Sequence, residues 1–359
     1  MAAALDLRRA VEGIFLHHGD HEDTEARALC ALAFLAMPRI PLRQAIGHWW
    51  TVAPLARHRL LPRSLPAWEP WTSTVDDPTF GAVPLTGAFH PPTRPSDTVA
   101  VVVHGVGGDV DSHYVQLAAL AAVRAGMGCL RLNMRGADLS GVDLYHAGLT
   151  DDIDAAVRSL RGFDHVVLIG YSLGGHLALR YALTDRDPRL RALAAICAPL
   201  DLTRASQDID GLGRLPYRRY VMESLTAMAR ALDAQGRLPA PLPQIVSIRR
   251  FRDWDDRVVA PRFGFADAED YYTRTSVGRR LHRLALPSLF VGVPHDPMVL
   301  PRACRPSLRR ASGALEVRWL DRGGHVGFPP GITLGLPGPR GLEPQVVRWL
   351  SERVDATAT

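Results

Sequence analysis

The sequence contains no lysine, so the 42 lysine and arginine positions of its 359 residues are all arginine. This absence excludes three chemistries that require a lysine amine: a Schiff base, a serine–lysine dyad and the phosphate-binding lysine of a P-loop. The net charge of +5 is scattered along the chain, without a basic stripe that also carries aromatic residues. We therefore expect no nucleic-acid partner.

Cysteine is also scarce. The four cysteines, Cys30, Cys129, Cys197 and Cys304, lie far apart and form no C-x-x-C pair. This spacing does not match a zinc site or a disulfide framework, so we expect reduced thiols, with Cys129 and Cys197 filling buried strands.

Long hydrophobic runs are missing as well. The longest early run, residues 28–37, is too short to span a bilayer, and no signal-peptide charge pattern precedes it. Hydrophobic residues make up 47% of the chain and charged residues 22%, which is close to the average of packed globular proteins. We expect a cytoplasmic protein without an integral membrane segment.

From residue 97 onward, short β-branched runs alternate with segments of helical period. This alternation is typical of a parallel sheet with crossover helices. The predicted strands are 98–105, 128–135, 166–170, 192–198, 288–293 and 315–320, and the predicted helices are 112–125, 151–161, 173–183 and 344–354. The sequence therefore predicts an α/β fold with a mostly parallel central sheet flanked by helices.

The alternation stops between residues 201 and 286, where the chain becomes helical in pattern and rich in arginine and aromatic residues. We interpret residues 201–286 as a helical cap inserted into a core made of residues 96–200 and 287–359. Residues 1–95 are predicted to hold an N-terminal helical segment, with a helix at 22–37, and one or two antiparallel edge strands after residue 62. The oligomeric state does not follow from the sequence.

The segment Gly170-Tyr171-Ser172-Leu173-Gly174 matches the pattern G-x-S-x-G, with a predicted strand before it and a helix after it. In this context the pattern indicates a nucleophile elbow, whose sharp turn leaves room only for small residues two positions before and after the serine. The turn also sets the serine at a helix N-terminus, where negative charge is favoured. Ser172 is our candidate nucleophile.

A serine hydroxyl needs a base, and the base needs an acid that holds its tautomer. His325 follows the predicted strand 315–320, and Asp296 follows the strand 288–293, so both should reach the sheet edge at which Ser172 lies. The chain order serine, acid, histidine is that of α/β hydrolases. Asp201, which follows the strand 192–198, is the alternative acid.

The oxyanion hole is expected to use the backbone N–H groups of Leu173 and of Val106, the latter in the glycine-rich loop after the first strand. Other polar residues have plainer interpretations. His104, His113, His146, His176 and His295 are interpreted as structural, and the cluster His17, His18, Asp20 and His21 as solvated, with no metal site. The charge run Asp253, Asp255 and Asp256 in the cap is expected to be solvated too.

With these residues in place, the chain resembles the YheT-like branch of the α/β hydrolases. The matching pieces are residues 47–51, His104-Gly105 with 112–114, 133–136, 170–175, Tyr271-Tyr272, Asp296-Pro297 and 323–328. Two positions depart from the family pattern: Gly107 replaces an acidic residue and Ala137 replaces a cysteine. The resemblance implies hydrolysis of carboxylic esters, plausibly hydrophobic or lipid-like small molecules, by a Ser172–Asp296–His325 triad without a cofactor.

The leading interpretation is thus a serine esterase that works through an acyl-enzyme. Two alternatives stay open: an acyltransferase with the same triad, and a non-catalytic ligand-binding protein on a hydrolase scaffold. The cap's apolar and aromatic residues favour acyl chains of medium length. The aromatic residues considered for this pocket are Tyr217, Tyr220, Phe251, Trp254, Phe263 and Phe265.

Overall fold

The computed structural model describes residues 41–358, of which residues 46–358 pack as one unit. Several sequence predictions concern residues outside this range and are not addressed by it. These are the helix at 22–37, the thiol of Cys30 and the cluster His17, His18, Asp20 and His21.

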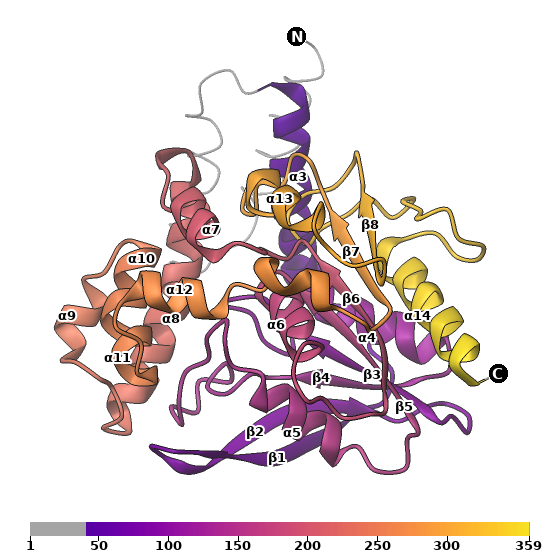
Figure 1. The fold of residues 1–359 in the computed structure, drawn as a ribbon, viewed down its shortest axis with the longest axis horizontal. Helices are drawn as coiled ribbons and strands as arrows, with labels where there is room; N and C mark the ends of the chain where they lie inside the picture. The colour runs from indigo at the N-terminus through magenta and orange to yellow at the C-terminus, as the bar shows by residue number, and fades with distance from the viewer. Residues whose placement is uncertain (1–40, 359) are drawn as a thin grey trace. The chain divides into compact units, whose positions relative to one another are not determined.

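An eight-stranded sheet forms the centre of this unit (Figure 1), with the strand order β1-β2-β4-β3-β5-β6-β7-β8. The strands are β1 (Glu69–Asp77), β2 (Gly81–His90), β3 (Thr98–Val103), β4 (Gly128–Leu132), β5 (His165–Tyr171), β6 (Leu190–Ile196), β7 (Ser288–Gly292) and β8 (Leu315–Trp319). β1 pairs antiparallel with β2, and β2 pairs antiparallel with β4, whereas all other pairs are parallel. The predicted mostly parallel sheet is confirmed, and β1 and β2 form an antiparallel pair at one side of it.

Helices cover both faces of the sheet, which explains why the central strands are continuous apolar runs. On β3, Val101 contributes to the core beneath α5 (Asp151–Ser159) and α6 (Leu173–Tyr181), while Val102 contributes to the core beneath α4 (His113–Arg124) and α14 (Leu342–Ala358). Both valines are fully buried. Burial of a valine side chain stabilises the fold by roughly 1.5–3 kcal/mol. Successive residues of β3 therefore stabilise the packing of helices on opposite faces of the sheet.

The chain between β6 and β7 contains helices joined by loops and no strand, and it forms the group of helices α7 to α12 in Figure 1. Its helices are α7 (Leu202–Ile209), η1 (Leu212–Arg214), α8 (Leu215–Ala234), α9 (Leu242–Val246), α10 (Phe251–Trp254), the π-helical turn η2 (Asp255–Val259), α11 (Ala260–Phe263), α12 (Ala268–Thr275) and η3 (Gly278–Arg283). Two short helices, η4 (Pro301–Ala303) and α13 (Arg305–Leu308), lie between β7 and β8.

A buried ionic network ties this inserted segment to the core. Arg135, which follows β4, contacts the carboxylates of Asp152, Asp77 and Asp143 at 2.6, 3.0 and 3.2 Å. Arg262 of α11 contacts Asp143 at 2.7 Å and Asp77 at 2.9 Å. Removal of one partner from such a buried pair costs about 3–5 kcal/mol, so the network fixes how α11 lies on the core.

One long helix was not predicted individually, although it falls within the segment 1–95 that was expected to be partly helical. This helix is α3 (Leu42–Leu60), which contains Pro54. Proline normally interrupts a helix, so the sequence pattern did not indicate a helix here. Within residues 41–358, no helix is both long and apolar enough to cross a membrane.

Candidate active site

Ser172 occupies the sharp turn between β5 and α6. Its φ of +52° and ψ of −118° lie in a region that non-glycine residues rarely adopt. A Cβ atom on Gly170 would collide with the backbone of Gly174, and a Cβ on Gly174 would collide with the carbonyl oxygens of Val103 and His104. The two glycines of the motif are therefore required by the geometry of the turn.

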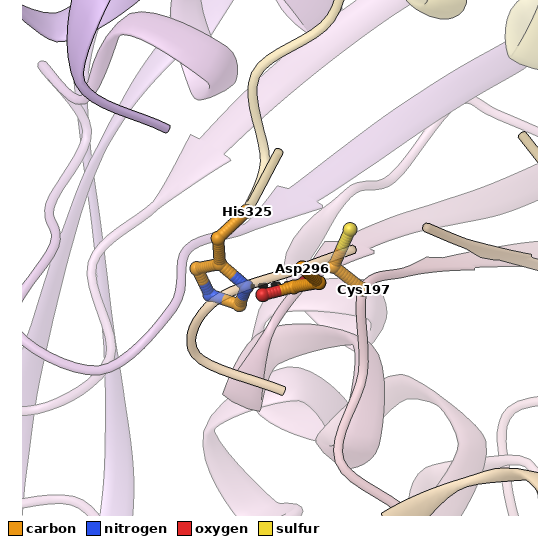
Figure 2. A group of neighbouring side chains, drawn as sticks. All are labelled: Cys197, Asp296 and His325. Atoms are coloured by element: carbon orange, nitrogen blue, oxygen red, sulfur yellow. Dashed lines mark hydrogen bonds and ion pairs between the residues drawn. The ribbon is translucent and has the colours of Figure 1, made fainter. Parts of the chain in front are cut away.

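The side chain of Ser172 begins a chain of hydrogen bonds. Its Oγ lies 2.9 Å from Nε2 of His325. Nδ1 of the same ring lies 2.9 Å from Oδ2 of Asp296, and these two side chains are drawn in Figure 2. This geometry allows Nδ1 to donate to the carboxyl group and Nε2 to accept from the serine hydroxyl. Oδ1 of Asp296 accepts the N–H groups of Met298 and Val299 at 2.8 and 2.9 Å, so both carboxylate oxygens are fixed.

The strand order explains why these residues meet. Ser172, Asp296 and His325 follow β5, β7 and β8, whose carboxyl ends share one edge of the sheet. β3 and β5 are neighbours, with Val103 opposite Gly170. The chain continues from β3 to β4 on one side and from β5 to β6 on the other, so the strand order reverses between β3 and β5. Open α/β sheets bind ligands at the carboxyl end of such a reversal.

The loop of His325 is held from outside the sheet by α3. The hydroxyl of Thr51 accepts the backbone N–H of His325 at 2.7 Å and donates to the carbonyl of Gly47 at 2.8 Å. A Cβ on Gly324 would collide with Gly47 and Thr51, so only glycine allows this close approach. Sequence analysis noted residues 47–51 only as part of a resemblance and assigned them no role.

The two backbone N–H groups considered for the oxyanion hole flank the serine. Val106 and Leu173 both line the cavity that contains Ser172. Among the described residues, neither N–H has a hydrogen-bond acceptor. Both groups are therefore available to an oxygen atom bound near the serine.

Hydrogen bonds to side chains hold the rest of the loop after β3. The N–H of Gly105 donates to the hydroxyl of Tyr114 at 3.1 Å, and the N–H of Gly107 donates to the hydroxyl of Tyr145 at 2.8 Å. A third bond joins the N–H of Val110 to Asn133 at 2.9 Å. Tyr114 and Asn133 belong to the segments of the family resemblance, whereas Tyr145 gave no signal in the sequence.

The alternative acid lies elsewhere. Asp201 caps α7, where its side chain accepts the N–H of Arg204 at 3.1 Å. The expectation that the charge run of the inserted segment is solvated is wrong for Asp255, which is only 5% exposed. The physical reason is that its oxygen Oδ2 is satisfied by the hydroxyl of Tyr272 at 2.5 Å.

Buried histidines near the site make local hydrogen bonds. His104 contacts the carbonyl of Gly105 at 2.7 Å and accepts the N–H of Met134 at 3.2 Å. His146 lies in the cavity wall and accepts the N–H of Gly148 at 3.1 Å. Burial lowers the pKa of both rings, that of His146 to about 3, so both are neutral near pH 7.

Cys197, Asp296 and His325 each offer a potential metal ligand, and these atoms lie within 4.8 Å of one another (Figure 2). Burial raises the pKa of the Cys197 thiol well above its ordinary value, which keeps it protonated and a poor ligand. The other two side chains are bonded to each other, so we assign no metal here. Cys129 and Cys304 are also buried free thiols.

A cavity of about 810 Å³, its open mouth included, extends from Ser172 and His325 into the inserted segment. Most of its wall is apolar. The apolar residues are Val106, Ala147, Leu173, Pro199, Leu202, Ala205, Ile209, Val221, Leu225, Phe251, Trp254, Val259, Met298 and Val299. Of the aromatic residues that the sequence suggested for the pocket, Phe251 and Trp254 line it, whereas Phe263 and Phe265 pack around His146 instead.

Comparison with known proteins defines the class. A sequence model of the alpha/beta hydrolase fold matches residues 99–330. The solved structure of 2,6-dihydroxy-pseudo-oxynicotine hydrolase aligns with a TM-score of 0.55 at 14% identity, over 98% of this chain and 85% of that one. The esterase Pf2001 of Pyrococcus furiosus aligns with a TM-score of 0.50 at 15% identity, over 74% and 90%. These structures share the α/β-hydrolase fold.

Curated relatives narrow the assignment. The putative esterase YheT of Escherichia coli is 33% identical over 330 residues, which cover 88% of this chain and 94% of the relative. The monoacylglycerol lipase ABHD2 of Danio rerio is 23% identical and matches 71% of this chain and 64% of its own length. The chain belongs to the YheT-like family of α/β hydrolases, whose relatives here are esterases and lipases.

Proposed function

We propose that the protein is a serine esterase that cleaves hydrophobic carboxylic esters through an acyl-enzyme on Ser172. The single observation that carries this proposal is the hydrogen-bonded chain Ser172–His325–Asp296 at the end of an apolar cavity. The names of the relatives, a putative esterase and a monoacylglycerol lipase, support the same class of reaction.

In the acylation step His325 acts as general base. Nε2 removes the hydroxyl proton of Ser172 as Oγ attacks the ester carbonyl, and it returns this proton to the departing alcohol. Asp296 accepts the Nδ1–H bond throughout, which keeps the ring in the required tautomer and stabilises the imidazolium. Water activated by the same histidine then releases the acid, so no cofactor is needed.

The tetrahedral intermediate carries a negative oxygen. We assign its stabilisation to the N–H groups of Val106 and Leu173, which have no acceptor in the described chain. The dipole of α6 adds to this effect because Leu173 is its first residue. The hydrogen bonds that hold the loop after β3 keep the N–H of Val106 in position before the reaction begins.

We further propose that residues 201–286 act as the cap that closes this site. The cavity wall contributed by this segment is mainly apolar, which favours acyl chains of medium length over charged or peptide substrates.

The proposal is tested with a fluorophosphonate probe and a panel of esters of increasing acyl length. We expect the probe adduct, located by mass spectrometry, on Ser172, and rates that rise from acetyl to medium chains. Ser172→Ala should remain folded but lose both labelling and hydrolysis. Equal labelling of this variant at another serine would overturn the assignment.

A further inference from the structure

A single carboxyl group interrupts the apolar wall of the inserted segment. Asp255 begins the π-helical turn Asp255–Val259 and lines the same cavity as Ser172, between the apolar residues Trp254 and Val259. Single π-helical turns occur frequently at functional sites.

The two oxygens of Asp255 have different surroundings. Oδ2 accepts the hydroxyl of Tyr272 at 2.5 Å. Oδ1 makes no hydrogen bond to any residue within the described part of the chain. Asp255 lines the cavity, so Oδ1 is the carboxyl oxygen that remains able to bond to a ligand held there.

Among residues 41–358, no cation forms an ion pair with this carboxyl. Arg252 is the nearby cation, and its guanidinium pairs with Glu269 at 3.2 Å. Burial, followed by the neighbouring carboxylates Asp210 and Asp256, raises the pKa of Asp255 to about 8. The group is therefore mostly protonated near pH 7, and Oδ1 then presents an O–H donor together with acceptor capacity.

We propose that Asp255 determines specificity by binding an uncharged hydroxyl carried on the acyl chain of the ester. This inference rests on the proposed esterase function of Ser172. The acyl group stays bonded to Ser172 until water releases it, so we place the acyl chain in the apolar cavity that extends from Ser172. A hydroxyl both donates and accepts, which matches a neutral carboxyl, whereas a plain alkyl chain leaves Oδ1 without a partner.

The test compares chromogenic esters of equal acyl length, one plain and the others with a single hydroxyl at successive carbons. The wild type should prefer one hydroxylated ester over the plain one by about tenfold in kcat/KM, the effect expected of one hydrogen bond. Asp255→Asn keeps a neutral donor and acceptor and should retain the preference. Asp255→Leu should bring the ratio to about one.

A control separates this role from a general effect on the cavity. Val259→Ala alters the other end of the same turn and should change the rates on both esters without changing their ratio. Should Asp255→Leu fail to fold, Tyr272→Phe removes the bond that orients the carboxyl and should reduce the preference. A wild type without preference at any carbon, or a preference that persists in folded Asp255→Leu, overturns the inference.

Calorimetric binding of the same esters to Ser172→Ala distinguishes the two proposals. Tighter binding of one hydroxylated ester, together with no hydrolysis by the wild type, would remove the esterase proposal and leave the hydroxyl site standing. Hydrolysis of all esters at the same rate would overturn the hydroxyl-binding proposal and leave the esterase proposal standing.

Discussion

The backbone N–H of His325 donates a hydrogen bond of 2.7 Å to the hydroxyl of Thr51, a residue 274 positions earlier in the chain. The family model begins at residue 99, so this bond ties the proposed catalytic loop to a helix outside the common core. α3 thereby takes part in setting the position of His325 over the carboxyl ends of the strands.

Thr51→Val tests this positioning role. The valine has nearly the same shape but cannot accept the N–H of His325, so the loop should shift while the fold is retained. Because displacements of about 1 Å can cost up to about a hundredfold in rate, we expect kcat to fall by about ten- to a hundredfold with little change in KM. Thr51→Ser restores the acceptor and should restore the rate. A wild-type kcat in folded Thr51→Val would show that the bond is dispensable.

Asp296 and Asp201 were the two candidate acids, and their geometry separates them. Asp296→Asn keeps an oxygen for the N–H groups of Met298 and Val299 but stabilises the wrong tautomer of His325. We expect a loss of about 10⁴-fold in kcat, the scale known for this change in a triad. Asp201→Asn alters only the cap of α7 and should stay within about tenfold of the wild type.

Circular dichroism and melting curves must accompany both aspartate variants, since a weakened turn at Asp296 could lower activity by unfolding alone. Near-normal turnover in folded Asp296→Asn, beside an inactive Asp201→Asn, would move the acid to the earlier strand.

The loop after β3 offers a third test. Tyr145→Phe removes the acceptor of the Gly107 N–H, which lies directly after Val106, and should misalign that proposed oxyanion donor. Loss of a whole donor costs about 10²–10³-fold in kcat, so a misaligned one should cost about tenfold.

Tyr181→Phe is the matched control for Tyr145→Phe. Tyr181 is also buried, and its hydroxyl bonds to Asp154 and to the N–H of Asp187, far along the chain from the loop. It should lower the melting temperature without lowering kcat. Equal losses of kcat in the two variants would remove the special role of the loop.

The core of the fold was predictable because its elements obey local rules. The strands from β3 to β7 are short and mostly apolar, and the glycines around Ser172 are imposed by the turn itself. The positions of Asp296 and His325 followed from chain order, since the carboxyl ends of parallel strands meet at one edge.

Other parts of the site depend on tertiary contacts and were missed. α3 contains a proline, so its helical pattern was obscured, and its bond to His325 spans most of the chain. Asp255 resembled part of a solvated charge run, because nothing local shows that Tyr272 and the cavity enclose it. Tyr145 holds the oxyanion loop through an equally non-local bond.

The raised pKa of Asp255 predicts how the stability of the folded protein depends on pH, and this test needs no substrate. Burial, then Asp210 and Asp256, moves the pKa from its ordinary value of 3.8 to about 8, while the hydrogen bond from Tyr272 and the charge of Arg252 act in the opposite direction. Between these two pH values the folded chain holds a proton that the unfolded chain has released. Stability contributed through this group is therefore present at low pH and is lost as the pH rises toward about 8.

Asp255→Asn carries no titrating proton and should escape this loss. We expect its melting temperature to rise relative to the wild type as the pH increases from about 5 to about 8, and the difference to level off above that. Asp187→Asn is the control: the hydrogen bond from Arg189 lowers the pKa of Asp187, so its titration is complete at acid pH and its curve should run parallel to the wild type in the same window. Parallel curves for Asp255→Asn as well would mean that Asp255 is ionised in the folded protein, and the neutral hydroxyl-binding role would then lose its physical basis.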